Sequence, residues 1–221
     1  MRLVLFDCDG TLVDSAHLIH EVMARTFEDF GHARLELAAT KSIIGLTLDI
    51  AIARLRGKAH VDEEALAMTA RYKEIFMGVR AEPGYQEPLF PGIEPLIRRL
   101  EREGDMLIGA VTGKSRRGLD AIRVTHGLEK TFLVSRTADD CPSKPHPAMV
   151  SECCTETGID AARTVVIGDA IYDMQMAKAA GARAVGVAWG YASVPELVEA
   201  GADHILREPA ELLQWLELAD A

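Results

Sequence analysis

Residues 3–11 read LVLFDCDGT: four apolar residues run directly into two aspartates, Asp7 and Asp9, which are followed by Gly10. A short apolar run that stops at turn residues is typical of a buried strand. Side chains alternate in direction along an extended chain, so Asp7 and Asp9 are expected to point the same way and to repel each other unless a cation lies between them. Mg²⁺ binds one or two carboxylates together with substrate phosphate oxygens, and Gly10 permits a tight turn that brings backbone N–H groups near an anion. The stretch therefore predicts a strand that ends at a magnesium and phosphate site.

Further short apolar runs recur along the chain, each bounded by turn residues. They lie at residues 106–111, 132–134, 164–167 and 184–188, with a weaker run at 204–206. From Met106 onward these runs alternate with amphipathic segments that have a helical period. That alternation predicts βαβ units and therefore an α/β fold, in which a Rossmann-like parallel sheet carries helices on both faces.

One long segment interrupts this pattern. Between Asp14 and about Gly84 no run has strand character, and two helical stripes of apolar residues, at 19–30 and 66–79, stand out instead. An insertion that follows the first strand lies above the carboxyl end of that strand, where ligands bind in open α/β sheets. We therefore expect a Rossmann-like core of residues 1–14 and 85–221 and a smaller all-helical cap domain of residues 15–84.

Three further polar motifs follow predicted strands. Thr112 and Gly113 offer a hydroxyl and a backbone N–H at a strand end, Lys144 stands between Ser143 and Pro145 in a proline-fixed loop, and Asp169 precedes Asp173 by one helical turn. Each motif has a plain structural explanation when it is taken alone: a helix cap, a solvated lysine, or an acidic helix start. Their order along the chain, acid pair, hydroxyl, lysine and acid pair, predicts that they meet at one edge of one sheet.

This ordered set resembles the haloacid dehalogenase-like hydrolase superfamily, and specifically its phosphatases with a helical cap after the first motif. The resemblance runs from Met1 to about the last twenty residues. Residues 12–15 (LVDS) and 186–191 (GVAWGY) are similar to those of phosphoglycolate phosphatases. Relatives that dehalogenate acids or cleave phosphonates lack the second acid of the pair, which is present here as Asp9.

The resemblance implies a role for each motif. Asp7 would be the nucleophile that forms an aspartyl-phosphate, ionised at its ordinary pKa of about 3.9. Asp9 would protonate the leaving alcohol and then deprotonate the hydrolytic water. Thr112 and Lys144 would hold phosphate oxygens. Mg²⁺ would be bound by the Asp7 carboxylate, the Asp9 backbone carbonyl and Asp169. Asp173 would orient the waters of the metal or Lys144.

The predicted function is that of a Mg²⁺-dependent phosphatase acting on a small phosphorylated metabolite, with 2-phosphoglycolate as the first substrate to try. Two alternatives remain open at this point. A sugar-phosphate mutase or phosphotransferase of the same superfamily would pass the phosphoryl group to a sugar hydroxyl, and a non-catalytic phospho-ligand sensor or binding protein would keep the fold without turnover. The mutase branch carries a cap histidine twelve positions after the nucleophile, where this chain has Ile19 between His17 and His20.

Lys41 is a further candidate, at the start of residues 41–45 (KSIIG) in the predicted cap. It stands about where related phosphatases often carry a basic residue. We expect Lys41, or the backbone beside it, to meet the carboxylate of a small acid substrate, although a solvated lysine explains the sequence equally well.

Composition limits the partners. The chain has 221 residues, of which 48% are hydrophobic, and 24 Lys and Arg face 34 Asp and Glu, for a net charge of −10. Such a charge repels nucleic-acid phosphates and anionic lipids, and no apolar run approaches the ~20 residues of a membrane span. The apolar start, residues 3–6, is too short for a signal-peptide core. We expect a cytoplasmic monomer or homodimer that binds neither nucleic acid nor membrane.

Overall fold

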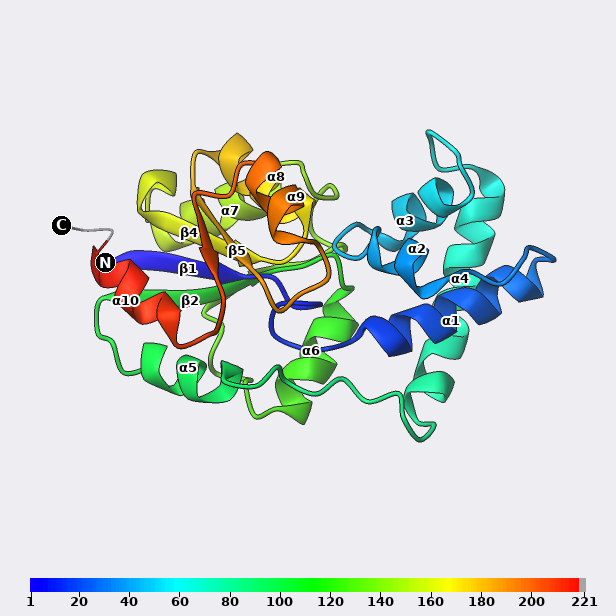
Figure 1. The fold of residues 1–221 in the computed structure, drawn as a ribbon, viewed down its shortest axis with the longest axis horizontal. Helices are drawn as coiled ribbons and strands as arrows, with labels where there is room; N and C mark the ends of the chain where they lie inside the picture. The colour runs from blue at the N-terminus through cyan, green and yellow to red at the C-terminus, as the bar shows by residue number, and fades with distance from the viewer. Residues whose placement is uncertain (219–221) are drawn as a thin grey trace.

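The computed structural model describes residues 1–218. Within them, six strands form one parallel sheet in the order β3-β2-β1-β4-β5-β6 (Figure 1). The strands are β1 (Arg2–Phe6), β2 (Met106–Val111), β3 (Val134–Arg136), β4 (Thr164–Gly168), β5 (Arg183–Val187) and β6 (His204–Leu206). The predicted parallel α/β architecture is confirmed.

The predicted strand at residues 132–134 is displaced by two residues. β3 begins at Val134, which pairs with Gly109 of β2, and ends at Arg136. Phe132 is buried in the core beside the sheet instead of within the ladder, whereas Leu133 is 62% exposed. The apolar run therefore includes two residues that precede the edge strand. Phe132 is apolar because it is buried in the core, although it does not pair in the sheet.

Alternate residues of β1 enter two separate cores. Val4 and Phe6 face the helices below the sheet in Figure 1, and Leu3 and Leu5 face those above it. The lower layer contains α5 (Ile93–Leu100), α6 (Arg116–Thr125) and α10 (Glu211–Leu218); the upper layer contains α7 (Ala148–Thr157), α8 (Ile171–Ala180) and α9 (Val194–Glu199). A short 3₁₀ helix, Ala161–Arg163, precedes β4. Burial on both faces explains why β1 is an apolar run without alternation.

Four helices lie together beyond the carboxyl ends of the strands, on the right in Figure 1, and are called here the inserted helices. They are α1 (Ala16–Asp29), α2 (Leu37–Lys41), α3 (Leu48–Leu55) and α4 (Glu63–Arg80). They share an apolar core of their own, in which Leu18, Ile52 and Met68 are fully buried. Leu66 belongs to the predicted apolar stripe of α4, yet it is 55% exposed. No helix in residues 1–218 combines the length and apolar character that crossing a membrane requires.

Local sequence explains where several helices begin and end. The Asp62 carboxylate accepts the N–H of Ala65 at 2.8 Å and caps α4, and the Ser115 hydroxyl accepts the N–H of Gly118 at 3.2 Å and caps α6. Gly181 ends α8 with a φ of 77°, a left-handed conformation that glycine adopts at little cost. These signals fix the lengths of the helices that flank the strand ends.

Gly109 of β2 lies where the core has no space for a side chain. A Cβ at this position would lie 2.7 Å from Leu5 Cδ2 and 2.8 Å from the carbonyl oxygen of Val134. We expect Gly109→Ala to lower the free energy of unfolding by about 2 kcal/mol, because the central strands would have to move apart. Urea denaturation measures this change. Gly78→Ala in α4, where a Cβ meets nothing within 4 Å, is the control and should leave stability unchanged or slightly higher. Equal stability of the two variants would contradict the packing argument.

Candidate active site

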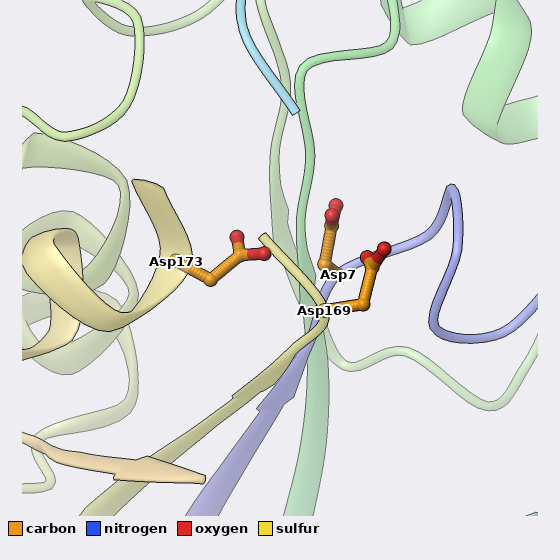
Figure 2. A group of neighbouring side chains, drawn as sticks. All are labelled: Asp7, Asp169 and Asp173. Atoms are coloured by element: carbon orange, nitrogen blue, oxygen red, sulfur yellow. The ribbon is translucent and has the colours of Figure 1, made fainter. Parts of the chain in front are cut away.

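Side chains from four parts of the chain meet at the carboxyl edge of the sheet. β1 and β4 are adjacent and parallel, so the residues that follow them, Asp7 and Asp169, leave the sheet side by side. Asp173 lies in the first turn of α8. Lys144 reaches the same place from the loop between β3 and α7. Figure 2 shows the three aspartate side chains converging from these elements.

Asp7, Asp169 and Asp173 form what we call the carboxylate cluster. One carboxylate oxygen from each lies within 4.8 Å of those from the other two, and all three residues are at most 1% exposed. The Lys144 ammonium, also buried, lies 2.9 Å from Asp7 Oδ1 and 2.5 Å from Asp173 Oδ1. Three carboxylates thus face one ammonium, and negative charge remains in excess.

Burial sets the acidity of the cluster. It raises the pKa of Asp7 to about 6, with a further rise from the Asp173 carboxylate that Lys144 partly offsets. Burial and the neighbouring Asp7 and Asp173 carboxylates also raise the pKa of Asp169 well above its usual range, whereas hydrogen bonds from the Tyr191 N–H and the Thr11 hydroxyl lower it. The ordinary pKa expected for Asp7 from sequence is therefore replaced by a higher one, because the chain removes this carboxylate from water.

The residues present fit a divalent cation. Asp7 Oδ2 is buried and has no hydrogen-bond partner among residues 1–218, a costly state for a carboxylate oxygen. The Asp169 carboxylate lies where only glycine backbone leaves space, since a Cβ on Gly10 would come within 2.2 Å of Asp169 Oδ2 and a Cβ on Gly190 within 2.1 Å of Asp169 Cβ. Excess charge, hard oxygen donors and an unpartnered oxygen together match the requirements of Mg²⁺.

Asp9 does not join the carboxylate cluster. Its carboxylate lies 2.8 Å from Lys114 Nζ and accepts a short hydrogen bond from the Ser15 hydroxyl. The expectation that Asp7 and Asp9 would point the same way, with a cation between their carboxylates, is therefore wrong. β1 ends at Phe6, so Asp9 lies in a turn, where the alternation of an extended strand no longer holds.

A second group of charges, called here the Lys114 cluster, contains Asp9, Lys114 and Glu87. Lys114 Nζ lies 2.8 Å from Glu87 Oε1, and Glu87 Oε2 lies 2.8 Å from Nε of Arg80. Burial raises the pKa of Asp9; the nearby Lys114 lowers it and Glu87 raises it further. Although burial lowers the pKa of Lys114, the Asp9 and Glu87 carboxylates hold it well above its usual range. Asp9 is thus a buried acid whose proton affinity is higher than usual.

Neither Lys114 nor Glu87, the other two members of this cluster, had been assigned a role from the sequence. Lys114 directly follows the Thr112-Gly113 motif, and this position in the sequence could have marked it as a site residue. Glu87 lies in the segment that returns from the inserted helices to the sheet, where the sequence offers no pattern that marks it. Its importance depends on tertiary contacts with Lys114 and Arg80.

Thr112 and Gly113 lie at the end of β2 beside the inserted helices. Thr112 is fully buried, and its hydroxyl accepts the N–H of Lys114 at 3.2 Å. A Cβ on Gly113 would lie 2.7 Å from the carbonyl oxygen of Gly45 and 2.6 Å from that of Leu46. The loop before α3 therefore packs directly on the backbone of this predicted phosphate-binding motif.

Lys41 contacts Tyr191, a neighbour of the carboxylate cluster. Its ammonium lies over the ring of Tyr191, 5.3 Å from the centroid. Tyr191 in turn donates its backbone N–H to Asp169 at 2.8 Å, and its hydroxyl accepts the N–H groups of Ser15 and Ala16 at 2.9 Å. Tyr191 thus links the carboxylate cluster to the start of α1, a function that the sequence did not reveal. Contact between Lys41 and a substrate stays a prediction.

A cavity of about 560 Å³ lies between the inserted helices and α6. Asp9, Glu87, Gly113 and Lys114 border it on the core side, and apolar side chains of α1 and α4 border it on the other. It connects the Lys114 cluster to the underside of the inserted helices, so a molecule whose reacting end reaches Asp9 would place its remainder there.

Comparison with known proteins agrees with this geometry. The family model described as haloacid dehalogenase-like hydrolase matches residues 4–187. The chain is 33% identical over 198 residues to "Probable phosphatase IndB" of Dickeya dadantii, covering 88% of this chain and 84% of that protein. It is 32% identical to a phosphoglycolate phosphatase of Xanthomonas campestris over 193 residues, with coverage of 86% and 84%.

The fold extends beyond phosphatases. A solved chain from Bacteroides vulgatus that carries a beta-phosphoglucomutase name has a TM-score of 0.80 and 25% identity to this chain, and the match covers 100% of this chain and 89% of that one. The overall fold is therefore shared by chains named for two reactions, and residues of the site must distinguish them.

Glu87 should be important for stability because two cations depend on it. We expect Glu87→Ala to lower the free energy of unfolding by about 3 kcal/mol, since Lys114 and Arg80 would lose a carboxylate that is only 2% exposed. Urea denaturation gives the change. Glu152→Ala is a matched control: its carboxylate is 49% exposed and pairs with Arg136, so its removal should cost less than about 1 kcal/mol. A Glu87 variant as stable as the control would refute the assigned role.

Proposed function

The chain belongs to the haloacid dehalogenase-like hydrolase family, and on that premise we propose that it is a Mg²⁺-dependent phosphatase that hydrolyses a small phosphomonoester through an aspartyl-phosphate on Asp7. Phosphoric monoester hydrolysis is the activity that the names of its relatives indicate. The observation that carries the proposal is the buried Asp7 carboxylate, which has one unpartnered oxygen and lies 2.9 Å from the Lys144 ammonium. The relatives make 2-phosphoglycolate the reference substrate.

Phosphate binding comes first. The Lys144 ammonium and the Thr112 hydroxyl hold phosphate oxygens, aided by the backbone N–H of Gly113; the N–H of Gly10, also expected from sequence to bind phosphate, instead donates to the carbonyl oxygen of Val13 at 2.9 Å. When bound by the Asp7 carboxylate, the Asp9 carbonyl and Asp169, Mg²⁺ would neutralise charge on the phosphate oxygens. Asp173 holds the Lys144 ammonium in position, since the two groups are in contact at 2.5 Å. Positioning and charge neutralisation provide most of the catalysis in phosphoryl transfer.

Two chemical steps follow. A carboxylate oxygen of Asp7 attacks phosphorus, a new O–P bond forms, and the bond from phosphorus to the leaving alcohol breaks while Asp9 donates a proton to that alcohol. Asp9, now ionised, takes a proton from water, which attacks the aspartyl-phosphate and releases phosphate and Asp7. The raised pKa of Asp9 suits the first step, and Lys114 and Ser15 stabilise its ionised form for the second.

Residues 15–84 form a cap domain in this proposal, over a core of residues 1–14 and 85–221. Contacts between the two parts support it: the Thr47 N–H donates to Ser143 Oγ at 2.9 Å, and Arg54 Nη1 donates to the Tyr172 hydroxyl at 3.0 Å. Residues 14–15 and 83–91 would act as hinges that allow the cap to open and close. The net charge of −10 favours a free metabolite over nucleic acid or membrane as partner, in a cytoplasmic setting.

The two alternative functions receive less support. Ile19, at the position of the mutase histidine, is nearly buried and lines the cavity, whereas the His20 ring contacts the Thr40 hydroxyl at 2.9 Å and His17 is exposed. The position of the mutase histidine is therefore occupied by a side chain that cannot titrate. The intact aspartates and the membership in a hydrolase family disfavour a non-catalytic sensor.

Replacing the nucleophile tests the activity. Asp7→Asn should lower kcat for p-nitrophenyl phosphate and for 2-phosphoglycolate by at least about 10³-fold, because an amide cannot form the aspartyl-phosphate. Phosphate release with Mg²⁺ and with EDTA measures turnover and metal dependence. Asp29→Asn, an exposed carboxylate paired with Arg71, is the control and should retain full activity. Undiminished turnover by Asp7→Asn, or turnover by the native chain that is independent of the metal, would refute the proposal.

Product analysis separates hydrolase from mutase. With a hexose phosphate as the substrate, we expect one equivalent of free phosphate for each sugar phosphate consumed and no isomerised sugar phosphate, because Ile19 offers no acid or base to a sugar hydroxyl. Phosphorus NMR of the reaction mixture distinguishes the products. Accumulation of an isomeric sugar phosphate would establish the mutase alternative instead.

A further inference from the structure

We propose that the preferred substrate of this site is a phosphomonoester whose alcohol part has a bulky apolar body, of at least ring size, and not the short carboxylate arm of 2-phosphoglycolate. The inference rests on the proposed phosphatase function and names its substrate class. It is carried by the size of the cavity beside Asp9, by the side chains that line it, and by the state of its charged groups.

Cavity size is the first argument. The volume of about 560 Å³ falls within the ~300–1,000 Å³ typical of sites that enclose drug-sized ligands. A glycolate group has about the volume of four water molecules at ~30 Å³ each, so it would occupy only about a fifth of this space. The remainder would have to hold water against apolar walls, which is an unfavourable arrangement for a specific site.

The lining is mostly apolar. Ile19 and Met23 of α1, Ile44 of the loop before α3, and Phe76 of α4 contribute to the wall opposite the core. Leu66 and Met77 of α4 also border the cavity, although they are 55% and 43% exposed. Large apolar side chains that are left exposed beside a pocket are expected to be covered when a ligand binds. An apolar leaving group would remove this surface from water, whereas a carboxylate would not.

The more buried cations of the cavity are already paired with carboxylates, whereas Lys73 and Arg117, which also border it, are exposed to solvent that screens them. Lys114 is 8% exposed and Arg80 is 21% exposed, and both are already paired with Glu87. A substrate carboxylate placed there would compete with Glu87 and Asp9 for the same cations. Lys41, expected from sequence to meet a substrate carboxylate, packs on Tyr191 and is not among the residues that line this cavity.

One hydroxyl in the wall remains without a partner. Thr69 Oγ1 is buried and makes no hydrogen bond within residues 1–218, and Thr69 lines the cavity from α4. Because this oxygen is shielded from solvent, Thr69 adds no accessible polar group to this part of the wall, which agrees with an apolar occupant.

Substrate preference gives the primary test. We expect kcat/KM for 2-phenylethyl phosphate to exceed that for 2-phosphoglycolate by at least about tenfold, with phosphate release as the measurement under identical Mg²⁺ concentrations. Equal values, or a preference for 2-phosphoglycolate, would overturn the inference while leaving the proposed phosphatase function intact. Absence of turnover with both esters and with p-nitrophenyl phosphate would overturn both.

A cavity-filling variant locates the preference. A Cβ on Gly118 of α6, which lines the cavity, would meet Ser115 Oγ at 3.4 Å and Lys114 Cβ at 3.5 Å, ordinary contact distances, so the backbone accepts a side chain there. Gly118→Leu should reduce the ratio of kcat/KM for 2-phenylethyl phosphate to that for 2-phosphoglycolate by about tenfold. The matched control, Gly78→Leu on α4, lies in open space and should keep the ratio of the native chain. An unchanged ratio in a folded Gly118→Leu protein, verified by circular dichroism, would show that the ring does not bind in this cavity.

Discussion

The fold as a whole depends on one constraint: three buried carboxylates must be held close together, with one ammonium between two of them. Asp7, Asp169 and Asp173 are withdrawn from water at the carboxyl edge of the sheet, and Lys144 can neutralise only part of their charge. A folded chain maintains such a group only when the surrounding structure fixes every position, because mutual repulsion would otherwise drive the side chains apart or protonate them. The sheet supplies that rigidity, since parallel strands buried on both faces allow their ends little freedom.

The backbone around the carboxylate cluster follows from the same constraint. Gly10 and Gly190 flank the Asp169 carboxylate so closely that any Cβ would overlap it, and a Cβ on Gly168 would lie 2.4 Å from Asp173. Tyr191 then donates its N–H to Asp169 while its hydroxyl accepts the N–H groups at the start of α1. The chain therefore fixes the position of a metal-type carboxylate and the entry of the inserted helices through one residue.

Local sequence was sufficient to predict the sheet and the residues at its carboxyl edge. Apolar runs revealed the strands, and Asp7 and Asp169 could be placed together because parallel strands bring their ends to one edge. A tight turn at Gly10 was predicted, but its effect on Asp9 was not: the carboxylate of Asp9 is carried away from Asp7 to Lys114. Glu87 escaped notice because its partners, Lys114 and Arg80, are distant along the chain. Lys41 was expected to face a substrate, but its contact with Tyr191 depends on how the inserted helices pack on the core.

Separation of the two charged groups has a chemical consequence. A nucleophile must be ionised, whereas a general acid must hold a proton, and two neighbouring carboxylates in one environment would tend toward the same state. Here Asp7 shares its surroundings with Lys144 and Asp173, while Asp9 faces Lys114 and Ser15 in a different part of the site. The turn at Gly10 places two aspartates that are separated by one residue in different electrostatic environments, which suits the distinct roles proposed for them.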